Sequence, residues 1–287
     1  MRACSVNASD VELVTGRPAY ARLFGLTRPR FHVLGSDVAG VVAAVGPGVR
    51  RLAVGDAVFG DAFESFGGFA ECAAVPEDRL IAKPEALDFA TAAALPQAGV
   101  IALQALRPVG PGARVLINGA GGGMGSFAVQ IAKARGAHVT AVDSAGKAGF
   151  LRGLGADRVI DYRAQDFAAL GERWDLVLDL FATRGMGAIR RALAPGGRYL
   201  LVGGRVSALL SVLTLGTLMS FGARRLRLLA ARQSRDDLAE IAGMVAAGRV
   251  RAAVDRTYRL EETAQALARV AEGRALGKVV VVMDGAG

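Results

Sequence analysis

The sequence is poor in the residues that build disulfide frameworks and metal sites. Its 287 residues include two cysteines, Cys4 and Cys72, and two histidines, His32 and His138. Two cysteines cannot form a disulfide framework and are too few for a cysteine-rich zinc site, so we expect a reducing compartment, the cytoplasm. The histidines lie far from any ligand partner in the sequence, and we expect them on the surface or satisfied within the fold. The sequence predicts no metal site.

Aromatic residues are also scarce, at 6% of the chain, and basic residues outnumber acidic ones to give a net charge of +9. A basic chain suits an anionic partner, such as nucleic acid, an acidic membrane surface or a phosphate-bearing cofactor. The arginines are scattered, however, and no aromatic residues interleave with them as a base-stacking surface requires. Nucleic acid is therefore not the partner that we expect.

The sequence opens without a secretory leader, which again favours the cytoplasm. Its longest uncharged run is Val206 to Gly222, which is rich in leucine and is followed by Arg224, Arg225 and Arg227. A membrane-spanning helix needs about 20 apolar residues, and this run is interrupted by Gly216 and by several Ser and Thr. Two interpretations stay open: a membrane anchor, which we do not expect, and an apolar helix that covers a pocket or a subunit interface.

What the sequence has in abundance is glycine and aliphatic residues, with 38 glycines and a hydrophobic fraction of 52%. The first hundred residues form short expected strands separated by turn residues. From Arg114 onward, expected strands and helices alternate, as in a doubly wound parallel sheet. The sequence therefore predicts an α/β protein with a β-rich first part.

A glycine-rich turn, Ile117 to Gly125, follows an expected strand and opens an expected helix. Gly122 lets a backbone approach a pyrophosphate, Gly125 allows close packing of helix on sheet, and the helix N-terminus offers free amides. The next strand ends at Asp143, 21 residues after Gly122, where an acid accepts hydrogen bonds from an adenosine ribose. This spacing predicts a dinucleotide site.

Which dinucleotide binds is left open by two opposing charges. Asp143 repels a ribose 2′-phosphate, whereas Lys147, four residues later, attracts one. A second interpretation of Asp143 also stays open, because its carboxylate is suited to capping the helix that begins near Lys147.

At this point the chain resembles the medium-chain dehydrogenase/reductase superfamily, in its zinc-independent quinone oxidoreductase and alcohol dehydrogenase-like branch. The resemblance spans essentially the whole chain. It rests on the glycine turn and on an ordered set of segments: Ser5-Val6-Asn7, Leu34 to Gly40, Val45-Gly46, Gly55-Asp56, Gly68 to Glu71, Leu154 to Asp157, Ile160-Asp161-Tyr162 and Gly277 to Val280.

The resemblance implies a GroES-like catalytic domain over residues 1–95, a Rossmann domain over 96–231 and a return to the catalytic domain over 232–287. The implied cofactor is NAD(P)H, with Tyr162 joining Lys147 at the 2′-phosphate of NADP, Lys278 near the pyrophosphate, and Gly203 and Gly204 near the nicotinamide. The full set of expected cofactor residues is Ala120, Gly122, Gly123, Met124, Gly125, Asp143, Ser144, Lys147, Tyr162, Gly203, Gly204 and Lys278.

The resemblance also locates the catalytic position. Asn7, Ser36 and Gln97 stand where zinc-dependent relatives hold their catalytic metal, and amide and hydroxyl groups are poor zinc ligands. Asn7 is therefore the implied hydrogen-bond donor to the substrate. Glu12 replaces an aromatic residue or histidine, and is either an unusual acid in the cleft or a surface residue. Ile101 replaces a threonine that is common beside the nicotinamide.

The segment before Ser5 is shorter than in the family, whose first strands precede it, so we expect unpaired sheet edges nearby. The predicted function is zinc-independent hydride transfer from NAD(P)H to a quinone, enone or carbonyl compound, by a homodimer. A non-catalytic NAD(P)-binding redox sensor or regulatory protein is the alternative. The sequence leaves the substrate undetermined, because such pockets are lined by scattered apolar side chains.

Overall fold

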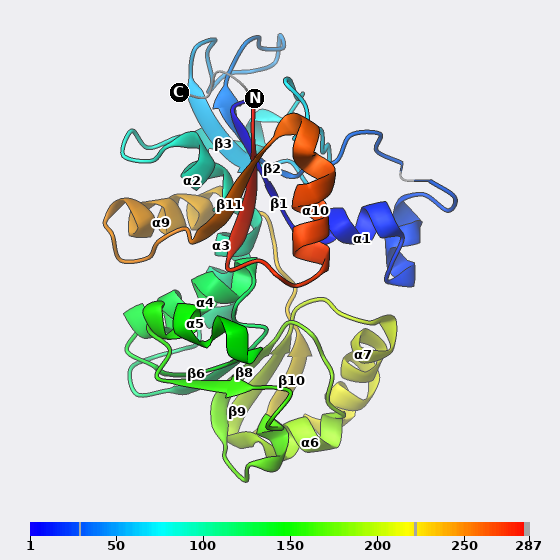
Figure 1. Ribbon diagram of the computed structural model, residues 1–287, viewed down its shortest axis with the longest axis vertical. Coiled ribbons are helices and arrows are strands. Elements are labelled where there is room, and N and C mark those ends of the chain that lie inside the picture. The colour runs from blue at the N-terminus through cyan, green and yellow to red at the C-terminus, as the bar shows by residue number, and fades with distance from the viewer. Residues whose placement is uncertain (29, 221–222, 284–287) are drawn as a thin grey trace. The chain divides into compact units, whose positions relative to one another are not determined.

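The computed structural model describes residues 1–28, 30–220 and 223–283. Contacts within the chain divide it into two compact units. The terminal unit contains Met1–Ile101 and Arg232–Gly287, and the middle unit contains Ala102–Ala231. Each unit has its own six-stranded sheet (Figure 1). The first boundary between the two units lies within α3 (Pro96–Leu106). The sequence predicted this boundary just before the helix.

The middle unit is built on a sheet whose strands are all parallel. Its order is β10-β9-β8-β5-β6-β7. Numbered along the chain within this unit, the strands run 3-2-1-4-5-6 from β7 to β10, which is the Rossmann order. The predicted fold class is confirmed. The strands are β5 (Arg114–Asn118), β6 (His138–Asp143), β7 (Arg158–Asp161), β8 (Trp174–Asp179), β9 (Leu193–Leu201) and β10 (Arg225–Leu228).

Helices cover both faces of this sheet, with α4 (Gly123–Ala134) and α5 (Ala148–Gly153) on one side and α6 (Met186–Arg191) and α7 (Val206–Ser211) on the other (Figure 1). Short 3₁₀ turns η3 (Ala145–Lys147) and η4 (Phe167–Ala169) link the strands. The core between sheet and helices is centred on large buried rings: Phe167, Trp174 and Tyr199 are each at most 1% exposed.

One set of turn-forming residues in this unit lies inside a strand. Pro195-Gly196-Gly197 has the composition of a turn, but β9 runs through it. Trp174 pairs with Leu193 and Leu176 with Arg198, so β9 carries extra residues between two registered pairs, and Gly196 has a φ of +81°. These turn-forming residues therefore make an irregularity within the sheet, not a loop before the strand.

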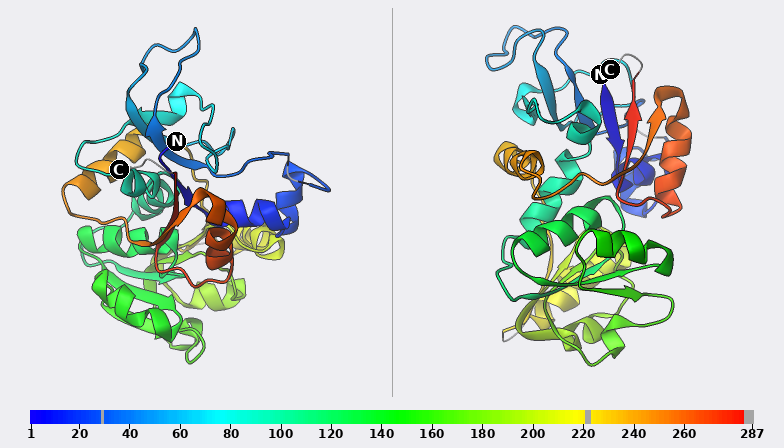
Figure 2. Two further views of the ribbon diagram at one scale, coloured as in Figure 1. Left: turned by 45° about the horizontal axis from the view of Figure 1, so that its top comes forward. Right: turned by 60° about the vertical axis from the view of Figure 1, so that its left-hand side comes forward.

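The terminal unit has the strand order β11-β12-β1-β2-β3-β4. Neighbours are antiparallel except β11 and β12, which are parallel. The strands are β1 (Ala3–Val6), β2 (Asp37–Val41), β3 (Ala57–Asp61), β4 (Leu80–Ala82), β11 (Val254–Arg259) and β12 (Lys278–Val282). The right-hand view of Figure 2 shows β1, β12 and β11 side by side. Both edges of β1 are therefore paired, and the sheet's edge strands, within the described ranges, are β4 and β11.

Helices of this unit begin at identifiable caps. Asn7 precedes α1 (Ala8–Thr15), a helix that the sequence did not predict, and its backbone N–H donates to Asp10 Oδ2 at 2.8 Å. Asp88 caps α2 (Phe89–Ala93), and Ser234 caps α9 (Arg235–Ala246). The remaining elements are α10 (Thr263–Ala271) and the 3₁₀ turns η1 (Ala19–Phe24), η2 (Glu77–Arg79) and η6 (Leu260–Glu262).

The apolar run beginning at Val206 is helical in three short pieces. These are α7, the π-helical turn η5 (Val212–Gly216) and α8 (Thr217–Met219). The last two residues of the expected run, 221 and 222, lie outside the described residues. In the part of the chain that the structure describes, no helix is both long and apolar enough to cross a membrane.

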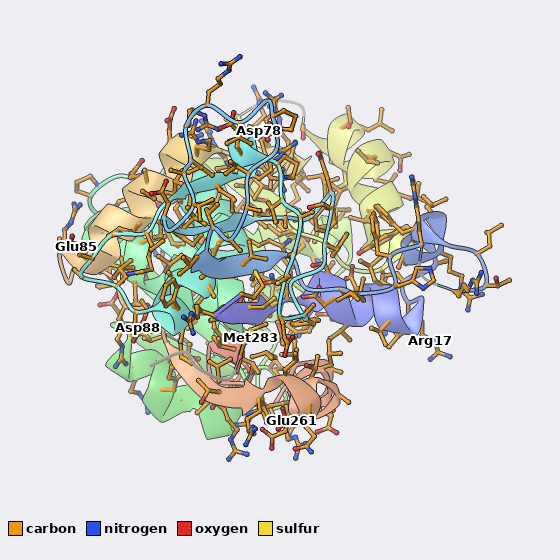
Figure 3. All side chains as sticks on the ribbon, turned by 90° about the horizontal axis from the view of Figure 1, so that it is seen from above. Arg17, Asp78, Glu85, Asp88, Glu261 and Met283 are labelled. Carbon is orange, nitrogen blue, oxygen red and sulfur yellow. The ribbon has the colours of Figure 1, made fainter. Side chains whose placement is uncertain are left out.

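The two units differ in charge. The middle unit has 17 Lys and Arg against seven Asp and Glu, a net charge of +10. The terminal unit has 18 against 19, a net charge of −1. Figure 3 shows acidic side chains of the terminal unit, among them Glu85, Asp78 and Glu261, projecting at its rim. The excess positive charge of the protein therefore belongs to the middle unit.

Candidate functional site

The glycine turn joins β5 to α4 and is shaped by close backbone contacts. A Cβ added to Gly125 would lie 2.3 Å from the carbonyl oxygen of Gly119 and 2.6 Å from Ala120 Cα. The first turn of α4 therefore packs directly on the turn before it, which only glycine permits. No side chain caps α4 at Gly122, so backbone amides at this helix end are suited to bind an anion.

Asp143, the last residue of β6, faces this turn. Its Oδ2 accepts from the backbone N–H of Gly121 at 2.8 Å, and its Oδ1 accepts from the backbone N–H of Ser144 at 2.8 Å. Ser144, not Asp143, precedes the helical turn that follows. The helix-cap interpretation of Asp143 is therefore wrong, because its carboxylate ties the second strand to the glycine turn instead.

Lys147 and Tyr162 lie at the same edge of the sheet. Lys147 Nζ is 3.7 Å from Asp143 Oδ1, and both side chains are 11% exposed. Tyr162 directly follows β7 and donates its backbone N–H to the carbonyl oxygen of Asp143 at 3.2 Å. Tyr162 is 45% exposed, and the Arg163 guanidinium lies over its ring, 5.6 Å from the ring centroid. Three of the predicted cofactor residues are thus brought together with the glycine turn.

Gly203 and Gly204 follow β9 at the carboxyl edge of the sheet. Their φ angles are +71° and +110°, in the region that favours glycine. A Cβ on Gly204 would lie 3.6 Å from Ala182 Cβ. The chain therefore turns tightly here, beside the loop that leaves β8.

A buried carboxylate that sequence reasoning missed organises this edge. Asp179, at the end of β8, accepts from Asn118 Nδ2 at 2.7 Å, from Tyr199 Oη at 3.0 Å and from the backbone N–H of Ala182 at 2.9 Å. Burial, followed by the Asp179 charge, raises the pKa of Tyr199. Asn118 and Asp179 are register partners at the ends of adjacent strands. Asn118 and Asp179 are polar residues at the ends of two neighbouring strands, and this pattern in the sequence could have predicted their contact.

In the terminal unit, Asn7 and Lys278 meet in the interior. Lys278 Nζ donates to Asn7 Oδ1 at 2.6 Å and lies 3.3 Å from Asp37 Oδ2. The Lys278 and Asp37 side chains are 1% and 0% exposed. Asp37 also accepts from Ser5 Oγ at 2.7 Å and from the backbone N–H of Gln97 at 2.9 Å. The ammonium is thus held inside the sheet by a carboxylate and an amide oxygen.

The other side of Asn7 is less occupied. Its Nδ2 donates to Ser36 Oγ at 3.4 Å, a long hydrogen bond. Because Oδ1 accepts from Lys278, the orientation of the carboxamide is defined, with the donor end turned toward Ser36. Asn7 is 7% exposed.

Two further carboxyl groups in this unit have raised pKa values. Burial raises the pKa of Asp10 to about 7, although backbone N–H groups of Asn7 and Gly35 donate to it. Burial, and then the charge of Asp37, raises the pKa of Asp61 to about 7. Asp37 and Asp61 are register partners on β2 and β3. Asp10 and Asp61 are therefore partly protonated close to neutral pH.

Glu12 lies on α1 and contacts a residue that the sequence did not single out. Tyr20 Oη donates to Glu12 Oε2 at 2.8 Å. Burial raises the pKa of Glu12, and the hydrogen bond from Tyr20 opposes this effect. Glu12 is half-buried, between the two interpretations that the sequence allowed.

The donor set around Asn7 does not fit a zinc ion. The Asn7 oxygen accepts from an ammonium group, and the Gln97 amide oxygen accepts from Ser9 Oγ at 3.1 Å. Both oxygens are thus engaged by donors. Over the described ranges, no cluster of three or more His, Cys, Asp and Glu residues is arranged to hold a metal. His32 and His138 are exposed, as expected.

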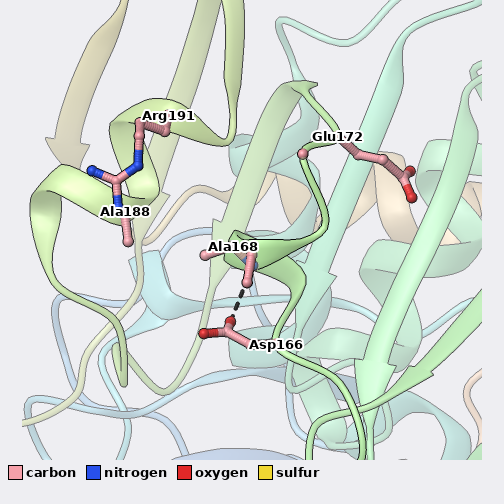
Figure 4. Close-up of a pocket in the computed structure, with 7 residues that line it drawn as sticks. Asp166, Ala168, Glu172, Ala188 and Arg191 are labelled. Carbon is pink, nitrogen blue, oxygen red and sulfur yellow. Dashed lines mark hydrogen bonds between the residues drawn. The ribbon is translucent and has the colours of Figure 1, made fainter.

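A separate depression lies on the middle unit, between η4 and α6, with a volume of about 360 Å³ (Figure 4). It is lined by Asp166, Glu172 and Arg191 together with small residues. Glu172 forms ion pairs with Arg114 and Arg158, which begin β5 and β7. Asp166, also in the lining, pairs with Arg184, which follows β8. The depression therefore lies along one face of the sheet and does not include the glycine turn.

Two family models match the chain. Residues 1–85 match the alcohol dehydrogenase GroES-like domain, and residues 154–281 match a domain described as zinc-binding dehydrogenase. A chloroplast envelope quinone oxidoreductase homolog of Arabidopsis thaliana is 31% identical over 296 residues, which cover 98% of this chain and 88% of the relative.

Solved structures agree. The quinone oxidoreductase of Coxiella burnetii superposes with a TM-score of 0.87 at 30% identity, over 98% of this chain and 88% of that chain. The quinone oxidoreductase of Escherichia coli, solved with NADPH, has a TM-score of 0.82 at 24% identity, over 98% and 89%. The chain therefore belongs to the medium-chain dehydrogenase/reductase superfamily, in its quinone oxidoreductase-like branch, and is an NAD(P)-dependent oxidoreductase.

Proposed function

We propose that the protein transfers a hydride from NAD(P)H to an electrophilic small molecule, such as a quinone, an enone or a carbonyl compound, without zinc. The observation that carries the proposal is the glycine turn closed by Asp143 on a sheet of Rossmann order. The names of the relatives from Arabidopsis thaliana and Coxiella burnetii support a quinone as one substrate class.

The turn fits a dinucleotide, because it has no side chain at two crowded positions: a Cβ at Gly121 would meet Lys147 and Asp143, and one at Gly125 would meet the backbone of the turn. When bound, the nicotinamide supplies the hydride. Amides at the start of α4 are suited to the pyrophosphate, with Ala120, Gly122, Gly123, Met124 and Gly125 as the proposed loop contacts. Asp143, Ser144, Lys147 and Tyr162 are the proposed adenosine contacts, and Gly203 and Gly204 the proposed nicotinamide contacts.

We further propose that NADPH is preferred over NADH. The Asp143 carboxylate already accepts two backbone N–H groups, and Lys147 partly neutralises its charge. The Lys147 ammonium and the neighbouring Arg163 guanidinium suit a 2′-phosphate. The bound NADPH of the Escherichia coli protein is in keeping with this preference. Fluorescence titration with both cofactors tests it, and equal affinities contradict it.

Polarisation of the substrate is assigned to Asn7. Without a metal, a hydrogen-bond donor must stabilise the negative charge that develops on the substrate oxygen, and the Asn7 Nδ2 is the donor that this side chain has left. The contacts of Lys278 support a role in orienting Asn7 rather than the pyrophosphate role that the family resemblance implies.

Proton delivery is assigned to Glu12. Its raised pKa increases the protonated fraction near neutral pH, and Tyr20 holds the carboxyl group in place at 2.8 Å. Glu12→Gln keeps the shape of the side chain and removes the proton. We expect it to lower kcat and to remove a limb of the pH profile of kcat, whereas Tyr20→Phe should displace that limb.

Two further proposals do not depend on the roles of Asn7 and Glu12. The first is that the reaction needs no zinc, which the donor set around Asn7 supports. The second is that the protein forms a homodimer, which rests on the family resemblance alone. The decisive experiment is turnover of NADPH and NADH with a panel of quinones and enones, in buffer containing a chelator. A preparation that binds the cofactor but reduces none of them would overturn the proposal in favour of a non-catalytic, redox-sensing protein.

A further inference from the structure

Phe181 is an exposed aromatic residue at the carboxyl edge of the parallel sheet. It is the second residue after β8, and it is 60% exposed. A Cβ on Gly119 would lie 2.7 Å from two ring carbons of Phe181, so the ring lies directly against the first residue after β5. The ring therefore lies beside the start of the glycine turn and presents much of its surface to solvent.

A buried carboxylate orients the loop that carries this ring. Asp179 Oδ1 accepts from the backbone N–H of Phe181 at 3.0 Å and from that of Ala182 at 2.9 Å. The Asp179 side chain is itself held by donors from Asn118 and Tyr199. The position of the loop is thus set by hydrogen bonds within the interior of the middle unit.

The same loop contains a strained residue. Ala182 has a φ of +51°, in the left-handed region that residues other than glycine rarely adopt. Such conformations persist only where the surrounding structure holds them, and they cluster at ligand sites. Here the hydrogen bond to Asp179 holds the strained residue at the edge of the sheet where ligands bind.

The direction of the Phe181 ring decides which half of a dinucleotide it faces. The carbonyl oxygen of Phe181 lies toward Gly204, a proposed nicotinamide contact, at 3.8 Å from the position of a Cβ there. The ring lies instead on Gly119, two residues before Gly121, whose N–H donates to Asp143 at the proposed adenosine site. The ring is therefore on the adenosine side of the loop.

We propose that Phe181 stacks on the adenine ring of the bound dinucleotide. This inference rests on the proposed function, because the dinucleotide must bind at the glycine turn. Stacking on an aromatic side chain uses the face of a base and not its hydrogen-bonding edges. Phe181 therefore strengthens binding of NADPH and NADH equally, whereas Asp143 and Lys147 discriminate between them. A ring that only covered Gly119 would contribute to folding and not to affinity.

The test is calorimetric titration of the whole protein with NADPH, NADH and two fragments. The fragment 2′,5′-ADP carries the adenine, and reduced nicotinamide mononucleotide lacks it. Phe181→Ala should weaken NADPH, NADH and 2′,5′-ADP by about tenfold each and leave the mononucleotide unchanged. Urea unfolding should change little, because most of the side chain is exposed.

Two matched variants separate stacking from apolar contact. Phe181→Leu keeps an apolar side chain without a ring and should reproduce most of the loss. Phe181→Trp should retain the affinity, and its indole should be quenched by 2′,5′-ADP, whereas the chain's own Trp174 is buried.

Equal affinities of the wild type and Phe181→Ala would overturn the assignment of Phe181 alone. So would a loss confined to the mononucleotide, or an indole that 2′,5′-ADP does not quench. A wild type that binds neither dinucleotide would overturn the proposed function together with this assignment.

Discussion

The two units of the chain form their proposed sites from different kinds of groups. The middle unit offers mainly backbone groups: glycines that allow close approach and amides at the start of α4, with the Asp143 carboxylate accepting from the Gly121 N–H of the preceding turn. The terminal unit offers side chains from distant parts of the chain, as in the contact of Asn7 with Lys278. The backbone site of the middle unit tolerates many different residues around a few glycines. The side-chain site of the terminal unit depends on the identity of each contacting residue.

The largest effect should come from the middle unit, by replacing Gly125 with Val. The new Cβ would clash with backbone at 2.3 Å, and backbone cannot turn away as a flexible side chain does. We expect a loss of about 5 kcal/mol in the free energy of unfolding, together with loss of dinucleotide binding. Urea unfolding measures the first. Gly149→Ala is the control, since nothing lies within 4 Å of its Cβ, and it should stabilise slightly.

Removing the buried cation from the terminal unit should come next. Lys278→Met leaves the Asp37 carboxylate buried without its ammonium partner, which costs about 3–5 kcal/mol. Adding Asp37→Asn should recover part of that loss in urea unfolding. A double variant that binds NADPH as the wild type does, yet has a lower kcat, supports the orienting role. A tenfold weaker affinity for NADPH with unchanged kcat would instead place Lys278 at the pyrophosphate.

The protonated carboxyl groups of the terminal unit predict that stability falls as pH rises. Asp10 and Asp61 have pKa values of about 7 in the folded chain and about 3.9 when unfolded. Between these values the folded state binds more protons, so the stabilisation is complete below about pH 4 and is lost as pH rises to about 7, by about 1.4 kcal/mol per pH unit for each group. Asp61→Asn mimics the protonated group and should flatten this slope; an unchanged slope would refute the assignment.

The smallest effect concerns which dinucleotide the middle unit prefers. Asp143→Ser removes the negative charge beside Lys147, so NADPH affinity should rise by about tenfold relative to NADH, or about 1.4 kcal/mol. Lys147→Ala is the matched opposite and should lower NADPH affinity while sparing NADH. Paired fluorescence titrations decide the matter, and a ratio that does not move in either variant would remove both residues from the 2′-phosphate site.

The sequence predicted the middle unit well because its signals are local. Strand ends, the glycine turn and the spacing to Asp143 are read within one βαβ segment, and β6 ends at Asp143 as expected. The structure of the terminal unit was harder to predict from the sequence. The helix α1 begins at a cap made by Asn7 and Asp10 within a region expected to be strands. Asn7 and Asp37, which contact Lys278, are far from it in the sequence. No periodicity or spacing in the sequence therefore predicts these contacts.

The bond between Lys278 and Asn7 also imposes an order of events on a growing chain. Asn7 is synthesised 271 positions before Lys278, the residue that donates to its side chain. The middle unit, Ala102–Ala231, is complete in sequence before that lysine is added. A chain truncated before β12 would therefore contain every residue of the glycine turn but lack the lysine that contacts the Asn7 amide.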